Sequence, residues 1–341
     1  MRYQKLSVLS LTICVAASVE AAEDRRPGVV VKGAVDYQVR MTTTMVVPVT
    51  NRSIDVLRVW HALPTPRPWS VSNRGVGATG IKASAGGKQE FNQRHNSHHI
   101  YWQIAGRQNP GSRHTFTTQF TVRSLERDFD PEKVRVTWQD YRKPASDPTA
   151  QVDPSLAAKV HPQIASLAGE IRKSMPPPAA VRAFCQWIHQ TIKYDASVPY
   201  AATDVAASVR QRRGHCGHHA AVLGQFCQHA KIPYRMVRGL NLYQQDGRGA
   251  LQAIKADYTN VHTWAEVYFP GIGWIEVEPS SGANAYRIPA KMIQNNPWFQ
   301  NYSIWIREAG TFKQPTWSYN QGKYSSDYGV ENVISFTTRK P

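Results

Sequence analysis

The chain is poor in cysteine and in acidic residues, and it lacks an apolar run long enough to span a membrane. Its 341 residues contain four cysteines, and 24 Asp and Glu stand against 41 Lys and Arg. A membrane helix needs about 20 consecutive apolar residues, and the marked apolar run near the N-terminus, residues 6–17, is shorter than that. The lack of a longer apolar run argues against a membrane-embedded protein.

The apolar run near the N-terminus has the features of a secretory signal peptide. Arg2 and Lys5 accompany its start, and a small-residue cleavage pattern ends at Ala21. We predict that residues 1–21 are removed by a cut after Ala21 or Ala22. The mature protein is then exported, either to the periplasm or into the medium, and keeps no transmembrane segment.

Export leaves an odd number of cysteines. Cys14 departs with the signal peptide, so Cys185, Cys216 and Cys227 remain. At least one thiol is therefore unpaired in a compartment where disulfides persist, and such a thiol is either reactive or buried and inert. Whether Cys185 and Cys227 form a disulfide stays open at this stage.

The excess of basic residues gives a formal net charge of +17. A field of this sign attracts anionic partners. The Lys and Arg residues are scattered, however, and no nucleic-acid-binding motif is present. We therefore expect no nucleic-acid partner, and a peptide, a protein or an anionic cell-envelope polymer is the better substrate for an exported basic protein.

Hydrophobic periodicity divides the chain. Residues 29–143 alternate apolar and polar side chains between turns rich in Gly, Pro, Asn and Ser, which predicts an antiparallel β-sandwich domain. We interpret residues 144–178 as a linker and a helix, residues 179–282 as helices followed by strands, and residues 283–341 as an extension that packs on this second domain. The predicted fold class is therefore α+β.

The helix between the two domains has its own end signals. Asp153 is a suitable cap and Pro154 fits the first turn. On this interpretation Pro162 lies inside the helix and should kink it.

The segment RRGHCGHHAAVLGQFC, residues 212–227, sets Cys216 between two glycines where an apolar helical pattern begins. Cys216 should therefore lie in the first turn of a helix. Unpaired N–H groups and the helix dipole there favour negative charge, which lowers the pKa of a thiol. Gly214 and Gly217 permit a substrate to approach the backbone closely. Cys216 is the candidate nucleophile.

A base for this thiol is available in NVHTWAEVYFPGIGWIEVEPSSG, where two alternating strands flank a turn at PGIG. The turn predicts that Tyr268 pairs with Trp274. This register puts Glu278 diagonal to His262, with about 7 Å between their backbones. A carboxylate so placed can orient the imidazole, which is the arrangement of covalent acyl transfer. Glu276 is the alternative carboxylate.

In this order the motifs IKYD, RRGHC, KIPYRMVRGL and HTWAEVYFPGIGWIEVEP resemble the transglutaminase-like superfamily, which is related to papain. The resemblance covers about residues 179–282 and implies a papain-like or transglutaminase-like catalytic domain, with helices packed on an antiparallel sheet. It implies Cys216 as nucleophile, His262 as general base and Glu278 as triad acid, although the family usually has Asp at that position. The strand-rich N-terminal region also resembles that of bacterial members.

Further site residues are assigned by position. The backbone N–H of Cys216 is the expected oxyanion donor, with Gln211 or Tyr194 as the side-chain donor. Arg213 and Trp264 are candidates for substrate binding, although Trp264 fits packing within the hairpin better.

The sequence does not predict a metal or a cofactor. Histidines crowd the cysteine, but the HCGHH pattern lacks the ligand spacing of a known structural zinc site; these residues are His215, His218, His219 and, from the hairpin, His262. No loop of clustered Asp and Asn is present, so the calcium dependence of animal transglutaminases does not carry over.

The sequence therefore predicts an exported thiol amidase or peptidase that acts through an acyl-enzyme intermediate. The first alternative is a protein-glutamine gamma-glutamyltransferase, in which an amine intercepts the same intermediate. The second is a catalytically silent binding module that keeps the fold.

Overall fold

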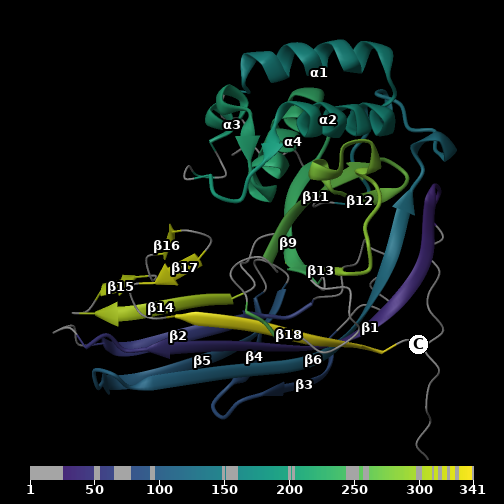
Figure 1. Cartoon of the computed structure of the whole chain (residues 1–341). Helices are drawn as coiled ribbons and strands as arrows, with labels where there is room; N and C mark the ends of the chain where they lie inside the picture. The colour runs from purple at the N-terminus through teal and green to yellow at the C-terminus, as the bar shows by residue number, and fades with distance from the viewer. Residues whose placement is uncertain are drawn as a thin grey trace, which may run out of the picture.

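The computed structural model describes most of the chain after residue 25; the described residues are 26–49, 54–64, 78–92, 97–147, 150, 160–198, 201, 204–242, 253–255, 261–296, 302–308, 311–313, 317–320, 323–326 and 330–339. The predicted signal peptide and Asp153 cap lie outside them. The helices gather at one end of the molecule, above antiparallel sheets (Figure 1), so the predicted α+β class is confirmed. None of the described helices has the length and apolarity needed to cross a bilayer.

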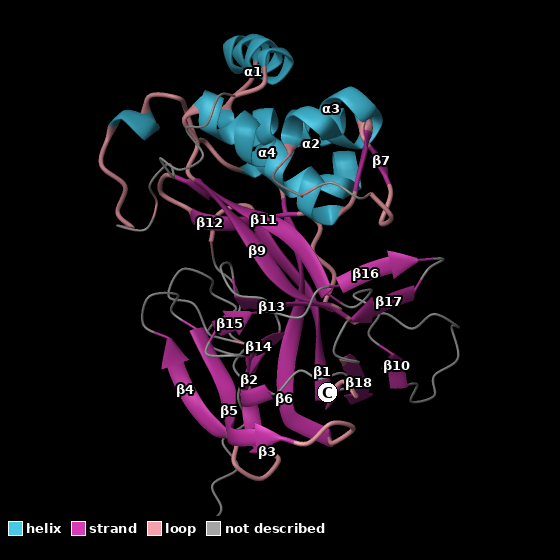
Figure 2. Cartoon of the chain, turned by 90° about the vertical axis from the view of Figure 1, so that its left-hand side faces the viewer, coloured by secondary structure: helices cyan, strands magenta, loops and turns pink. Residues whose placement is uncertain are grey.

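Two five-stranded sheets form the end away from the helices (Figure 2). Their orders are β10-β18-β1-β6-β3 and β15-β14-β2-β5-β4. Alternate side chains of both sheets meet in one apolar cluster, which includes Val39, Val59, Trp102 and Phe120. The strands from the first part of the chain are β1 (Val29–Val46), β2 (Ile54–Ala62), β3 (Thr79–Ala83), β4 (Lys88–Asn92), β5 (Ser97–Gln108) and β6 (Arg113–Phe129).

The other half packs helices on a four-stranded sheet of order β12-β11-β9-β13. The apolar stripes of α2 and α4 meet there, where Phe184 stacks on Phe226 with ring centroids 4.7 Å apart. The helices are α1 (Pro162–Ser174), α2 (Pro177–Thr191), α3 (Val205–Gln211) and α4 (Cys216–Ala230), with short 3-10 turns η3 (Pro131–Lys133), η4 (Asp140–Arg142) and η6 (Pro279–Asn284). The strands are β9 (Tyr234–Asn241), β11 (Val261–Phe269), β12 (Gly273–Val277) and β13 (Met292–Asn296).

Pro162 opens α1 instead of bending it. It occupies the first helical position, where a missing N–H costs nothing and the fixed φ of proline suits the helix. The predicted kink is therefore wrong for the described helix.

The C-terminal strands enter the N-terminal sheets, and this differs from the expectation that residues 283–341 pack on the catalytic domain. β14 (Tyr302–Glu308) pairs with β2, and β18 (Glu331–Arg339) pairs with β1. Each satisfies its backbone groups on a strand that is distant in sequence. Within the extension, β13 does join the four-stranded sheet, where it pairs with β9. The remaining strands are β10 (Ala253–Lys255), which pairs with β18, and β15 (Thr311–Lys313), β16 (Trp317–Asn320) and β17 (Lys323–Ser326).

The end of β6 links the two halves. Arg127 exchanges backbone hydrogen bonds with Ile288, and Phe129 stacks on Phe269 of β11 with centroids 5.6 Å apart. The Arg127 guanidinium also forms an ion pair with Glu276 of β12. The sheet that carries His262 is thus fixed to a long strand of the N-terminal region.

Candidate active site

Cys216 is the first residue of α4, as the apolar pattern predicted. The residue before it, His215, has extended backbone angles and caps the helix. Its Nδ1 accepts a hydrogen bond from the backbone N–H of Gly217 at 3.1 Å, and the His215 N–H donates in turn to Nδ1 of His218 at 3.2 Å. This reciprocal capping fixes the turn on which the thiol stands. The N–H of Cys216, at the first helical position, has no acceptor within the helix.

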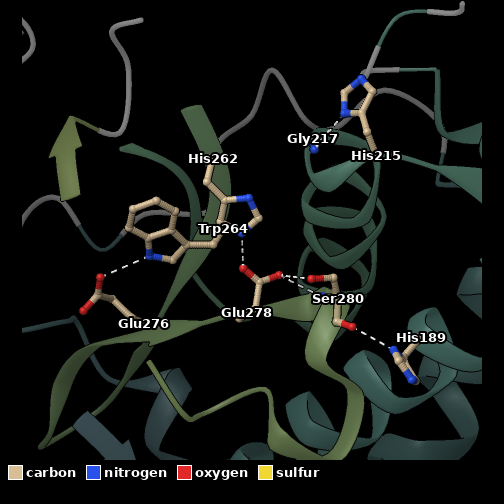
Figure 3. Close-up of polar contacts among 8 residues, drawn as sticks. All are labelled: His189, His215, Gly217, His262, Trp264, Glu276, Glu278 and Ser280. Carbon is tan, nitrogen blue, oxygen red and sulfur yellow. Dashed lines mark hydrogen bonds and ion pairs between the residues drawn. The ribbon is translucent and has the colours of Figure 1, made fainter. Parts of the chain in front are cut away.

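The β11–β12 hairpin brings the predicted base to its predicted acid. Tyr268 pairs with Trp274, so the predicted register is confirmed. Nε2 of His262 lies 2.5 Å from Oε2 of Glu278. Figure 3 shows Glu278 directed at the His262 ring. The other ring nitrogen of His262 remains for the thiol.

Glu278 is itself held in place. Its Oε1 accepts hydrogen bonds from the backbone N–H of Ser280 at 3.0 Å and from the Ser280 hydroxyl at 2.5 Å. The carbonyl oxygen of Ser280 lies 2.7 Å from Nδ1 of His189 on α2. The sequence analysis did not predict the contacts of Glu278 with Ser280 or of Ser280 with His189. The order Glu-Pro-Ser could have indicated the first contact, because a Glu before Pro can cap the turn that follows.

Glu276, the alternative acid, faces a different partner. Its Oε1 accepts a hydrogen bond from Nε1 of Trp264 at 3.1 Å, and Arg127 neutralises it. Figure 3 shows it directed away from the histidine. The two carboxylates at the end of β12 thus have different partners: Glu276 contacts Trp264 and Arg127, and Glu278 contacts His262.

The electrostatics of the pair favour separated charges. Burial alone favours the neutral thiol of Cys216, but hydrogen bonds from His215 and His262, together with the positive charge of His262, outweigh it and lower the pKa of Cys216 to about 5. Burial alone favours the neutral ring of His262, but the Glu278 charge and the contact with Cys216 raise its pKa to about 10. Between these values the site holds a thiolate and an imidazolium.

The pKa of Glu278 is held below its usual value. Burial alone would raise it, but the His262 charge and the hydrogen bonds from His262 and Ser280 outweigh the burial. The acid therefore remains ionised where it touches the ring.

The two oxyanion candidates lie in different surroundings. Tyr194 belongs to β7 (Lys193–Tyr194), which pairs with β8 (Arg213–Gly214) so that Tyr194 lies beside Gly214. Its hydroxyl reaches Cys216; burial first, then the charge and hydrogen bond of Cys216, raise the pKa of Tyr194. Tyr194 nevertheless keeps half of its surface exposed, and Gln211 is exposed at the end of α3.

The two candidates for substrate binding also lie in different surroundings. Arg213 forms an ion pair with Asp195 at 2.7 Å and is part exposed. Trp264 is fully buried and stacks on His262 with centroids 5.8 Å apart. Trp264 therefore contacts the base from within the core.

The neighbouring histidines and cysteines are built into the protein interior. His218 and His219 are buried, and burial lowers the pKa of His219 to about 4. No cluster of three or more potential metal-ligating side chains occurs in the described part of the chain. Cys185 and Cys227 are free and buried, and burial raises the pKa of both thiols.

Residues 165–279 match the sequence profile of the Transglutaminase-like superfamily. This region is therefore similar to transglutaminase-like domains. The domain resembles two curated proteins in sequence: YebA, an uncharacterized protein of Bacillus subtilis, is 32% identical over 73 residues, and a protein-glutamine gamma-glutamyltransferase of Pseudomonas aeruginosa is 27% identical over 138 residues. These matches cover 21% and 39% of this chain, but only 10% and 20% of those proteins.

Solved structures similar to this chain share little sequence with it. A candidate cysteine protease from Cytophaga hutchinsonii aligns over 91% of this chain and 100% of its own, at 14% identity with a TM-score of 0.49. The periplasmic domain of TgpA from Pseudomonas aeruginosa, bound to ethylmercury, aligns over 74% of this chain and 91% of its own, at 16% identity with a TM-score of 0.33.

Proposed function

We propose that the protein is an exported thiol-dependent amidase or peptidase that cleaves a peptide or envelope-polymer amide bond with Cys216, His262 and Glu278. The observation that carries the proposal is the chain of contacts from the Cys216 thiol to the His262 ring and on to Glu278, at 2.5 Å. This is the order nucleophile, base and orienting acid that acyl transfer requires.

In the acylation step the Cys216 thiolate attacks the amide carbonyl carbon, and the carbonyl oxygen takes the negative charge. The N–H of Cys216 is the backbone donor to that oxygen, and the Tyr194 hydroxyl beside the thiol is the preferred side-chain donor. The intermediate collapses as the C–N bond breaks. The His262 imidazolium gives its proton to the departing amine, which leaves a thioester on Cys216.

In the deacylation step His262, now neutral, takes a proton from water, and the hydroxide oxygen attacks the thioester carbonyl. The C–S bond breaks, the acid product leaves and the thiolate returns. Glu278 stays ionised throughout, so it stabilises the imidazolium each time it forms. The dense packing of Trp264 against the ring keeps the base in one orientation.

The proposal is tested on a panel of peptides by measuring amide cleavage, together with peptide mapping after brief treatment with iodoacetamide. We expect modification of Cys216 alone, with loss of cleavage in proportion, because Cys185 and Cys227 are buried. The Cys216→Ala variant should be inactive with an unchanged melting temperature. Cleavage by Cys216→Ala at the wild-type rate would contradict the proposal, because the activity would then not depend on this thiol. A wild-type protein that cleaves no peptide of the panel would favour the silent module.

A second candidate, transfer of the acyl group to an amine, is favoured by the sequence match to a gamma-glutamyltransferase. Incubation with a glutamine peptide and a labelled amine separates the two. If the protein is a hydrolase, the amount of free acid product exceeds the amount of labelled product at millimolar amine. An excess of labelled product supports the transferase.

Export is part of the proposal and rests on the first 21 residues. Expression of the full chain in a bacterial host should yield a periplasmic or secreted product that starts at Ala22 or Glu23. Cytosolic protein that keeps Met1 would contradict it.

A further inference from the structure

We propose that Arg238 binds a carboxylate of the substrate beside the scissile amide, so that the site selects acidic acyl donors. Arg238 lies on β9, opposite Thr263 of β11, and its neighbour Gly239 lies opposite His262. The proposal rests on the proposed function for the reaction and adds the chemical class of its substrate.

The sheet register places Arg238 on the side that faces α4. Side chains two residues apart on a strand share a side, and Met236, two residues before Arg238, packs against the apolar cluster that contains Val222 and Phe226 of α4. Cys216 begins that helix. The guanidinium therefore lies on the side of β9 that faces α4, and it is close enough to Cys216 for the two charges to interact.

The surroundings of Arg238 differ from those of the other buried arginines. Arg235 pairs with Glu266, and Arg127 pairs with Glu276. In the described ranges Arg238 has no carboxylate within ion-pair distance. Burial lowers the pKa of Arg238, and the Cys216 thiolate is the charged group that raises it in return. A half-buried guanidinium beside a nucleophile, with no carboxylate partner among the described residues, is suited to bind a carboxylate of a ligand.

The chemistry limits the ligand. A guanidinium binds a carboxylate through two parallel charge-assisted hydrogen bonds, which are strong where water is scarce. Since the scissile carbonyl must meet Cys216, the bound carboxylate belongs to the residue that becomes the thioester or to its immediate neighbour. The ligand class is thus an acidic peptide amide, in accord with the net charge of +17.

The first experiment measures the contact without any substrate. Iodoacetate and iodoacetamide alkylate the same thiolate, but only iodoacetate carries a carboxylate, so the ratio of their rates cancels any change in thiolate content. For Cys216 we expect Arg238→Gln to lower this ratio about tenfold, the size of one charge-assisted hydrogen bond. Arg238→Lys should lower this ratio less than Arg238→Gln, because it keeps the positive charge. Arg210→Gln, which removes an exposed charge from α3, is the matched control and should leave the ratio unchanged.

The second experiment uses pairs of peptide amides that differ only as Glu or Gln, and as Asp or Asn, at the acyl residue. The wild type should favour the acidic member at least about tenfold in kcat/KM, and Arg238→Gln should remove the preference by slowing the acidic member alone.

The outcomes separate the two proposals. An iodoacetate ratio that stays within about twofold of wild type in Arg238→Gln overturns the carboxylate site, as does a variant that slows both reagents or both peptides equally. If no peptide is cleaved while the ratio falls as expected, the proposed hydrolysis fails and the carboxylate site stands.

Discussion

Two histidines, the buried His61 and the largely buried His262, lie in the two halves of the molecule, and each has a partner on both ring nitrogens. His61, in the N-terminal sheets, lies 2.8 Å from the Thr43 hydroxyl and 3.0 Å from the Thr118 hydroxyl. His262 contacts the Cys216 thiol and the Glu278 carboxylate. Burial lowers the pKa of His61 to about 3, whereas that of His262 rises to about 10.

The difference lies in the partners, since both rings are removed from water. A hydroxyl can donate or accept, so it satisfies a neutral ring and gives no reason to hold a proton. A carboxylate and a thiolate only accept, and each lowers the energy of the charged ring. Burial by itself therefore favours a neutral histidine, and the acid of the hairpin favours the charged ring of His262.

The largest effect should come from removing that acid. In Glu278→Gln the amide cannot stabilise the imidazolium, so kcat should fall about a hundredfold or more while the melting temperature changes little. Steady-state kinetics and calorimetry on the same preparation measure both.

Glu276→Gln is the matched control, because it removes a charge from the same strand end. It leaves Arg127 without its ion-pair partner, so it should reduce stability more than kcat. If Glu276→Gln abolishes activity and Glu278→Gln does not, the comparison between the two histidines loses its basis.

The next effect concerns His61. His61→Leu removes two buried hydrogen bonds and should lower the free energy of unfolding by about 1–3 kcal/mol, while the alkylation rate of Cys216 is unchanged. Because the pKa of His61 is lower in the folded state, its contribution is present above pH 6.5 and declines as the pH falls toward 3. Urea titrations at several pH values should therefore show a flatter acid limb for the variant; an unchanged limb would mean that His61 titrates normally.

The smallest effect should come from His215. His215→Asn keeps a side chain that caps α4 but removes the ring beside the thiol, so the pKa of Cys216 should move up from about 5. The iodoacetamide rate measured from pH 4 to 9 should show the midpoint rise, with the plateau kept. A lower plateau at an unchanged midpoint would instead indicate a damaged helix start.

Local patterns predicted the reactive parts well. The start of α4 at Cys216 follows from its apolar spacing, and the pairing of Tyr268 with Trp274 follows from the turn length. The contact between His262 and Glu278 follows in turn from that register. Each of these features is decided within a few residues, where sterics and hydrogen bonding act directly.

Features set by distant partners were not accessible in this way. The C-terminal extension contains the strand β18, but nothing in its sequence pattern identifies β1 as the neighbour of this strand. Arg238 illustrates the same limit, because its sequence context is an ordinary strand and its significance comes from the helix start that it faces. The prediction of a kink at Pro162 failed for another reason. A proline that starts a helix and a proline that kinks one can stand in similar sequence surroundings.

The pairing of β18 with β1 also has a consequence for the order in which the molecule is made. Asp36 pairs with Arg339, and Thr44 with Glu331, so a central strand of the first sheet lacks this neighbour until residues 331–339 have been synthesised. Until then one side of β1 is an open template for any extended chain, and such long-range closure is slow. A chain cut before residue 331 thus keeps the residues of the proposed site but has an unpaired β1 edge. Such an edge favours aggregation or proteolysis of the truncated protein.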